Sequence, residues 1–219
     1  MKTRSILFTI IAMLTVTTLV FQSCKKKDDP PDITPTTGFF TDARDGQQYA
    51  YVVIGSQIWM AQNLNYQTAN SYWYDDNSAN GDIYGRLYTW EEALTVCPSG
   101  WHLPSDNEWK TLGMALGMSQ GEADSTGFQG TDQGKKMKAI SGWNSNGNGT
   151  NSSGFNALPG GLRSSGGVFY DLGLLGHWWS STESLTSTAW LRYLRYDRDQ
   201  VGRDGWNKEN YLSVRCIKD

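Results

Sequence analysis

The sequence predicts an α+β domain in which two helices pack on small antiparallel sheets with long irregular loops. Three observations indicate this class. Two segments carry helix-start signals, at Thr89 and at Ser105, and each continues with apolar residues at helical spacing. Two sets of side chains alternate near the start of the domain and again near its end, as they do in strands. The stretches between them are rich in Gly, Asn and Ser, which favour turns and loops.

The chain has 219 residues and begins with a basic stretch, an apolar run from Ile6 to Phe21 and then Cys24. This order is typical of a secretory signal, and the run is short for a membrane-spanning helix, which needs about 20 residues. The cysteine resembles the lipidated cysteine of bacterial lipoproteins, in the relaxed signal found in Bacteroidetes-type bacteria. We therefore expect removal of residues 1–23, lipidation of Cys24 and a location at the outer membrane and cell surface. The alternative is an ordinary signal peptide with an incidental cysteine.

The composition places a tether before the domain and limits the partners. Residues 24–38 are mostly Lys, Asp, Pro and Thr, which predicts a flexible tether ahead of a domain at residues 39–219. The chain has 10 Trp, 11 Tyr, 7 Phe and 24 Gly, so large rings joined by Gly-rich loops can form its core. Its net charge is −3, whereas nucleic-acid binding needs a basic surface. We expect membrane contact through the lipid and no nucleic-acid partner.

The domain opens with a predicted hairpin. Two sets of apolar side chains alternate over residues 49–54, which are rich in Tyr, Val and Ile, and this indicates a strand. Gly55-Ser56 separate it from a second apolar stretch at residues 58–64. Residues 65–85 are rich in Asn, Tyr, Asp and Gly, which indicates a loop.

Two helices are expected next. The first begins after Thr89 and extends to Cys97, with Glu92 bonding back to the start as in a capping box. The second begins after Ser105, where a second capping box starts, and ends at Gly117.

The rest of the chain is expected to contain loops and strands. Residues 118–170 read as loop, apart from a short helix at residues 135–140, and strands are expected at residues 178–182, 189–196 and 212–217. Trp178 and Trp179 must point to opposite sides of their strand, so at most one of them faces solvent.

Cys97 and Cys216 remain once Cys24 is assigned to the lipid. An even number of cysteines outside the cytoplasm predicts a disulfide, and the alternative is two buried free thiols. In the chain-entropy model, a disulfide that closes a loop of this length contributes ~5 kcal/mol.

The order of helix, cysteine, second helix, Trp-rich strand and final cysteine resembles the C-type lectin-like fold. A closer resemblance, over roughly residues 39–219, is to the Fibrobacter succinogenes major paralogous domain family. The segments that carry it are Ile58–Leu64, Cys97–Pro104, Ala157–Gly161, Trp178–Glu183 and Ser213–Cys216. The resemblance implies a C-type lectin-like fold, in which a cysteine of the first helix bonds to the last strand. That family has no settled biochemical activity.

Residues 102–109 also resemble a segment of formylglycine-generating enzymes, which share this fold. Those enzymes need two neighbouring cysteines near the C-terminus to bind copper, whereas this chain has only Cys216 there and Tyr at position 211. No His-Glu-x-x-His, Cys-x-x-Cys or Gly-x-Ser-x-Gly motif is present, and His102 is expected to be structural. We therefore expect no enzyme activity, with a formylglycine-generating oxidoreductase as the alternative that the missing cysteine argues against.

Calcium-dependent sugar binding would need ligands that the sequence lacks. The nearest counterpart of the Trp-Asn-Asp motif of sugar-binding C-type lectins is Trp206-Asn207-Lys208, where a lysine replaces the ligating carboxylate. We expect no metal and no other cofactor. Calcium stays an open alternative, because short acidic runs such as Asp75-Asp76 offer oxygen ligands.

Aromatic and polar residues in the expected loops are the candidate ligand-binding residues. An indole face can stack on a sugar ring while neighbouring polar groups bond its hydroxyls. The candidates are Trp73, Trp143, Tyr196, Asp197, Trp206 and Asn207. We expect a non-catalytic domain that binds a glycan or a protein, and the alternative is a structural or adhesive surface protein.

Overall fold

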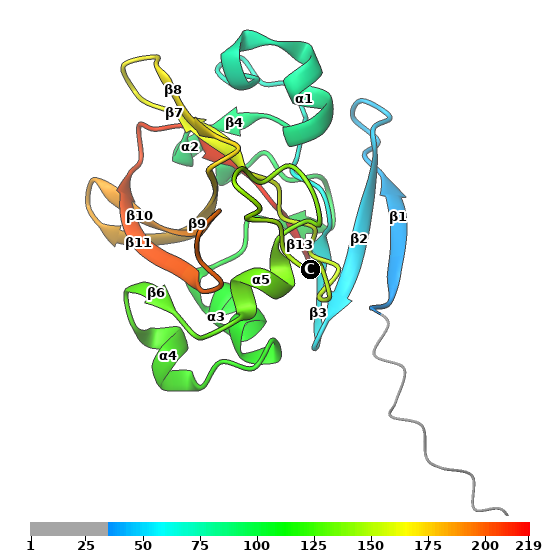
Figure 1. The fold of residues 1–219 in the computed structure, drawn as a ribbon. Coiled ribbons are helices and arrows are strands. Elements are labelled where there is room, and N and C mark those ends of the chain that lie inside the picture. Colours follow the sequence, from blue (N-terminus) through cyan, green and yellow to red (C-terminus); the bar gives the residue numbers. More distant parts are fainter. Residues whose placement is uncertain (1–34) are drawn as a thin grey trace, which may run out of the picture. The chain divides into compact units, whose positions relative to one another are not determined.

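Two β-sheets organise residues 35–219, the part of the chain that the computed structural model describes (Figure 1). Within this part there are thirteen β-strands, five α-helices and one short 3-10 helix, which agrees with the expected α+β class. The expected signal peptide, the lipidation site Cys24 and most of the expected tether lie outside the described residues.

Most elements are short, and the strands outnumber the helices. The strands are β1 (Thr37–Thr41), β2 (Gln48–Ile54), β3 (Gln57–Met60), β4 (Leu87–Tyr88), β5 (Trp101–His102), β6 (Gly127–Gln129), β7 (Gly160–Arg163), β8 (Phe169–Leu172), β9 (Leu175–Leu185), β10 (Thr188–Arg195), β11 (Val201–Asn207), β12 (Leu212–Ser213) and β13 (Ile217–Lys218). The helices are η1 (Tyr74–Asp76), α1 (Ser78–Tyr84), α2 (Trp90–Ala93), α3 (Asp106–Ala115), α4 (Gln120–Asp124) and α5 (Gln133–Met137).

The first sheet has the strand order β1-β2-β3-β13-β5 and joins the two ends of the domain. The expected hairpin is confirmed, because β2 and β3 pair antiparallel. The last strand, β13, pairs with β3 through Ile217 and Trp59. The sequence did not indicate β1, which begins at Thr37, before the expected domain start at Phe39, and pairs along β2.

The second sheet has the order β4-β12-β9-β10-β11-β6, with the hairpin β7–β8 attached to β9. The expected strands at residues 178–182 and 189–196 are confirmed as β9 and β10. The expected strand at residues 212–217 is interrupted, because β12 lies in this sheet and β13 in the first. Residues 201–207 form β11, although the sequence indicated a loop that would present Trp206 and Asn207.

The two expected helices are present, but they differ in length and in how their N-termini are capped. Helix α3 has the full capping box, with Ser105 and Glu108 bonding reciprocally. Helix α2 ends at Ala93 and does not extend to Cys97. Its expected capping box is incomplete, because one Glu92 carboxylate oxygen accepts hydrogen bonds from the loop at residues 68–70.

Three further α-helices are present, and the sequence predicted only one of them, the short helix α5. Helix α1 lies in the expected loop at residues 65–85, and α4 lies in the expected loop after α3. Helix α5 ends at Met137, earlier than the short helix expected at residues 135–140. It ends because Lys138 leaves the helix and its ammonium donates to the carbonyls of Arg195, Tyr196 and Arg198.

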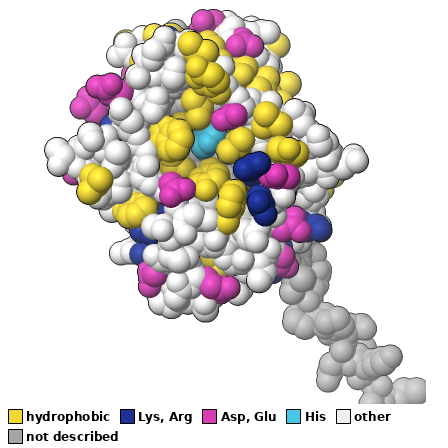
Figure 2. Space-filling model, turned by 60° about the vertical axis from the view of Figure 1, so that its left-hand side comes forward, with side chains coloured by type: hydrophobic (Ala, Val, Ile, Leu, Met, Phe, Trp, Pro, Cys, Tyr) yellow, Lys and Arg dark blue, Asp and Glu magenta, His cyan; other side chains and the backbone are white. Residues whose placement is uncertain are grey.

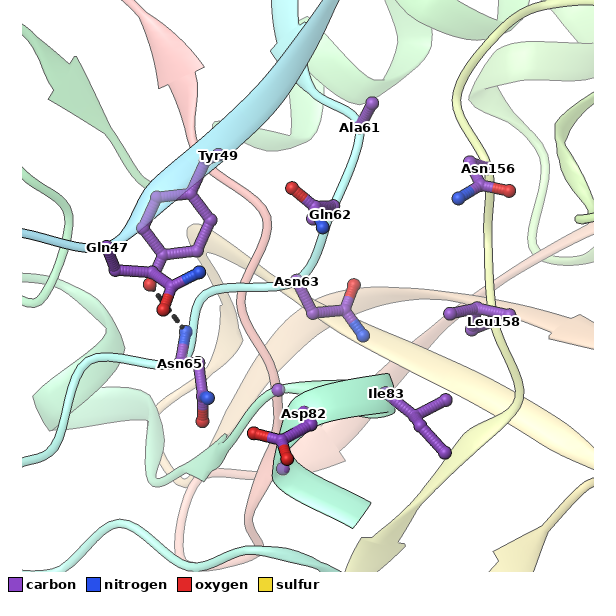
Figure 3. Close-up of a pocket in the computed structure, with 12 residues that line it drawn as sticks. Gln47, Tyr49, Ala61, Gln62, Asn63, Asn65, Asp82, Ile83, Asn156 and Leu158 are labelled. Carbon is purple, nitrogen blue, oxygen red and sulfur yellow. Dashed lines mark hydrogen bonds between the residues drawn. The ribbon is translucent and has the colours of Figure 1, made fainter. Parts of the chain in front are cut away.

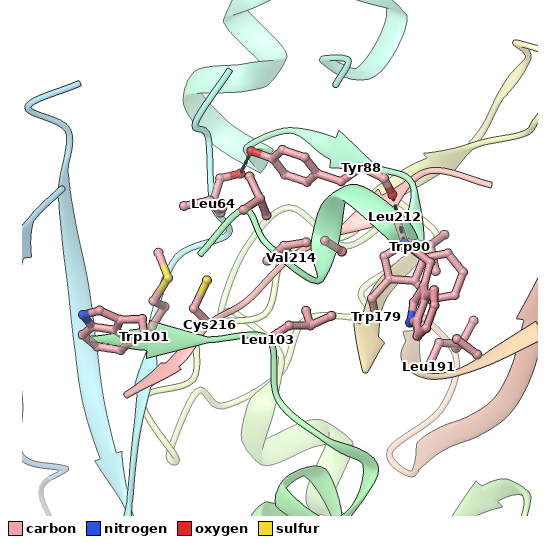
Figure 4. Packing of buried hydrophobic residues seen from close by; sticks show 14 of the residues in the cluster. Leu64, Tyr88, Trp90, Trp101, Leu103, Trp179, Leu191, Leu212, Val214 and Cys216 are labelled. Carbon is pink, nitrogen blue, oxygen red and sulfur yellow. Dashed lines mark hydrogen bonds between the residues drawn. The ribbon is translucent and has the colours of Figure 1, made fainter. Parts of the chain in front are cut away.

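Strand β9 separates two apolar cores. Both Trp178 and Trp179 are 0% exposed, which confirms that neither ring faces solvent. Trp179 packs in one core with Tyr88 and Leu212, and its indole nitrogen donates to the Tyr88 carbonyl (Figure 4). Trp178 packs in the other core with Phe155. A single strand therefore fixes both cores, because its side chains alternate between them.

The expected disulfide is confirmed. Cys97, just after α2, is bonded to Cys216, between β12 and β13, with a Cα–Cα distance of 6.0 Å and a sequence separation of 119 residues. The bond excludes the alternative of two buried free thiols. Neither of these cysteines is free to bind copper as in formylglycine-generating enzymes.

Candidate functional site

One face of β9, β10 and β11 carries a groove, and the opposite face packs against α3. Pairing of the three strands brings distant residues together on the groove face. Tyr193 on β10 lies opposite His177 on β9, and Leu191 lies opposite Asp204 on β11. Trp206 shares the face of Asp204, because side chains two apart along a strand point the same way.

The hairpin β7–β8 borders this face and completes the groove. Two adjoining hollows of about 210 Å³ and about 280 Å³ share Asp171 and Trp206 in their walls. We call these hollows the aromatic groove, lined by Tyr170, Asp171, His177, Tyr193, Asp204 and Trp206. Figure 2 shows a face on which apolar side chains gather around a histidine, with acidic and basic side chains at the border of the patch.

Two aromatic rings of the groove are accessible. Trp206 is 39% exposed and Tyr170 is 49% exposed. The Trp206 ring lies 6.3 Å from the His177 ring, and the His177 ring is stacked on Tyr193 at 6.1 Å. The Trp206 ring therefore lies next to a stacked pair of rings, and together the three rings give the groove an aromatic surface.

His177 forms a buried polar floor beneath these rings. Burial lowers the pKa of His177 to about 4, although a hydrogen bond to the Gly161 backbone favours the protonated form. The imidazole is therefore neutral near pH 7. Its Nδ1 atom is buried and has no hydrogen-bond partner within residues 35–219. A buried polar atom of this kind normally bonds to a water or a ligand.

Two carboxylates flank the rings. The Tyr193 hydroxyl donates to Asp204 Oδ2 at 3.1 Å, and burial together with this carboxylate raises the pKa of Tyr193 to about 12. Burial also raises the pKa of Asp171, and the charge of Arg195 offsets part of that rise. Asp171 adopts a positive φ of 69°, a conformation that aspartate tolerates better than most residues.

A buried ion cluster holds the strands from behind. On the opposite face of the sheet, Arg192 and Arg203 both donate to the carboxylate of Asp106, the first residue of α3. The two arginines come from β10 and β11, so Asp106 ties both strands of the groove to the helix.

Among the candidates from the sequence, only Trp206 lies in the aromatic groove. Its neighbour Asn207 is exposed, but its side chain accepts from the Glu209 backbone nitrogen and shapes the following turn. Tyr196 is partly buried against one core, and Asp197 pairs with Arg195 at 2.8 Å.

The structure corrects the expected exposure of Trp143 and gives Trp73, which is half-buried, partners of its own. Trp143 is only 4% exposed and donates from Nε1 to the Ala157 carbonyl, so it belongs to the core. Trp73 packs beneath the Arg86 guanidinium at 4.0 Å and donates to Asn65. These partners occupy the ring of Trp73 and leave it outside the groove.

Sequence reasoning missed Tyr170, Asp171, His177, Tyr193 and Asp204. The alternation along residues 189–196 assigned Tyr193 to one strand face, but it did not identify the neighbouring strand. That neighbour is β11, whose Gly and charged residues give no apolar alternation.

A separate hollow outside the aromatic groove, of about 150 Å³, is lined mainly by polar residues near β2, α1 and residues 156–158 (Figure 3). Several of its polar groups already have structural partners. Asn63 Oδ1 accepts from Trp178 Nε1 and from the buried Arg215 guanidinium. Gln62 accepts from the Ala50 nitrogen, and the Tyr49 hydroxyl accepts from the Asn65 nitrogen. These bonds favour a role in the fold, and we place the candidate site in the aromatic groove.

Residues 35–219 contain no candidate metal site and no candidate membrane-spanning helix. No three His, Cys, Asp or Glu side chains of this part are grouped so that they could hold a metal ion. None of its helices has the length and apolar character needed to cross a bilayer.

Comparison with known proteins gives one match. The family model described as the Fibrobacter succinogenes major domain matches residues 52–218. No curated protein and no solved structure matches the chain.

Proposed function

We propose that this chain, which belongs to the Fibrobacter succinogenes major domain family, is a cell-surface lipoprotein whose domain binds a glycan without catalysis. The observation that carries the proposal is the aromatic groove. A partly exposed indole lies beside a histidine ring, two carboxylates and a buried unpartnered nitrogen. Aromatic faces stack on the apolar faces of sugar rings, and the acceptors bond their hydroxyls.

The location and the finer fold are part of the same proposal. The signal-like segment before Cys24 supports lipid anchoring, and the disulfide fits a compartment outside the cytoplasm. A C-type lectin-like fold is supported by this bond, which links the residues after α2 to the end of the chain. The absence of a free cysteine pair within residues 35–219 supports binding over formylglycine-type oxidation.

The test is a glycan array probed with the full chain, purified in mild detergent after processing by a lipoprotein-producing bacterium. We expect hits that Trp206→Ala abolishes. The matched control is Phe39→Ala, which removes an exposed ring from β1, in the other sheet, and should leave the hits unchanged. An array without Trp206-dependent hits would refute the proposal. Capture of a surface protein by the same chain would then favour the structural or adhesive alternative.

A further inference from the structure

We infer that the aromatic groove selects neutral or amine-bearing saccharides of at least two residues and excludes acidic ones. This inference rests on the proposed function and specifies its ligand class. Three features of the groove carry it: the sign of its charges, the unpartnered nitrogen on its floor and its division into two hollows.

Charge is the first feature. Asp171 and Asp204 are the only side chains in the walls of the two hollows that carry a formal charge, and no Lys or Arg lines them. The positive charge of Arg195 lowers the pKa of Asp171, but the Arg195 guanidinium already pairs with the Asp197 carboxylate at 2.8 Å. Whether Asp171 is ionised or protonated, it offers no positive charge. A ligand carboxylate or sulfate would lose its hydration and meet like charge, which strongly disfavours binding at a partly buried site.

The floor of the groove points to the same ligand class. Near pH 7 His177 is neutral, and its Nδ1 has a lone pair without a partner in the described part of the chain. Because Nδ1 is buried, a donor from the ligand would reach it through a water molecule or after a small shift of the covering side chains. The neutral imidazole supplies no positive charge that could pair with a ligand carboxylate or sulfate. The carboxylates and the neutral histidine on the floor therefore favour a ligand that carries hydrogen-bond donors and no negative charge.

The shape of the groove sets the minimum length. Sites that enclose drug-sized ligands typically have about 300–1,000 Å³. Each hollow is smaller, at about 210 Å³ and about 280 Å³, so each fits roughly one sugar ring. The two hollows meet at Asp171 and Trp206, which places the exposed indole between two linked rings.

The test is an array of neutral, amine-bearing and acidic oligosaccharides of one to six residues, probed with the full chain in mild detergent. We expect Trp206-dependent hits among neutral or amine-bearing glycans, with binding at least tenfold weaker for monosaccharides. Acidic counterparts should bind at least tenfold more weakly at low salt, and high salt should narrow the difference because it screens the repulsion. The double variant Asp171→Asn, Asp204→Asn should admit acidic glycans, whereas Asp82→Asn, an exposed carboxylate on α1, should not.

The outcomes separate this inference from the proposed function. Trp206-dependent hits that include acidic glycans at similar strength would overturn the inference and leave glycan binding in place. Monosaccharides that bind as well as longer chains would overturn the two-ring arrangement. Exclusion of acidic glycans that persists in the double variant would overturn the role of the two carboxylates. Complete absence of Trp206-dependent hits would instead remove the proposed function itself.

Discussion

Replacing Asp106 with asparagine should strongly destabilise the domain. The Asp106 carboxylate is buried and receives hydrogen bonds from Arg192 Nη1 at 2.9 Å, Arg203 Nε at 2.9 Å and Arg203 Nη2 at 2.8 Å. Both guanidinium groups are themselves buried. The Asp106→Asn variant keeps the size of the side chain but leaves two buried positive charges without a counter-ion. Loss of one partner of a buried ion pair costs ~3–5 kcal/mol.

The pKa of Asp106 shows how strongly the two arginines favour the ionised carboxylate. Burial alone raises this pKa, but the hydrogen bonds and charges of Arg203 and Arg192 outweigh burial and lower it from 3.8 to about 2. Each unit corresponds to about 1.4 kcal/mol, so ionisation of Asp106 contributes ~2 kcal/mol to the free energy of unfolding. Because the folded-state pKa is depressed, this contribution is present above the unfolded pKa. It is lost as the pH falls from about 4 to about 2.

Urea unfolding at pH 7 measures the effect of Asp106→Asn directly. The matched control is Asp197→Asn, which breaks a more exposed pair with Arg195 and should cost at most ~1 kcal/mol. The wild-type domain should also lose more stability between pH 4 and pH 2 than the Asp106→Asn variant, by ~2 kcal/mol. A loss of less than ~1 kcal/mol in Asp106→Asn at pH 7 would contradict the reasoning, because the buried arginines would then not depend on this carboxylate.

Three other predictions follow from the disulfide and from the groove. Reduction of the Cys97–Cys216 bond should lower the free energy of unfolding by ~5 kcal/mol in the chain-entropy model, measured by urea unfolding with and without reductant; unchanged midpoints would argue against this stabilisation. Because burial holds the pKa of His177 near 4, below the ordinary histidine value of 6.5, the free energy of unfolding should fall by ~3 kcal/mol as the pH falls from about 6.5 to about 4. His177→Phe should remove that loss, and an identical pH profile in the variant would refute the assignment. Gly202→Ala should weaken glycan binding at least tenfold, because the new methyl group would collide with the Tyr193 ring; unchanged affinity would show that Tyr193 does not shape the groove.

Short-range patterns in the sequence predicted the helices and hairpins whose hydrogen bonds form between residues close together in the chain. The capping box of Ser105 and Glu108 predicted the start of α3, because both bonds form within one turn. The alternation around Gly55 predicted the first hairpin for the same reason. A similar box at Ser119 and Glu122 begins α4, but this helix has only five residues and lacks the apolar periodicity that would have revealed it.

The sequence by itself therefore determined the broad class, the principal helix and the disulfide, which follow from short-range patterns and from the small number of cysteines. Only the tertiary structure decided which rings reach solvent. Trp143 and Trp206 both have Gly or Asn as neighbours in the chain, yet they are 4% and 39% exposed. Trp143 turns inward because Nε1 finds the carbonyl of Ala157, whereas Trp206 lies on the outer face of β11. The groove arises from the pairing of β9, β10 and β11 beside a hairpin, and such long-range contacts leave no local pattern in the sequence.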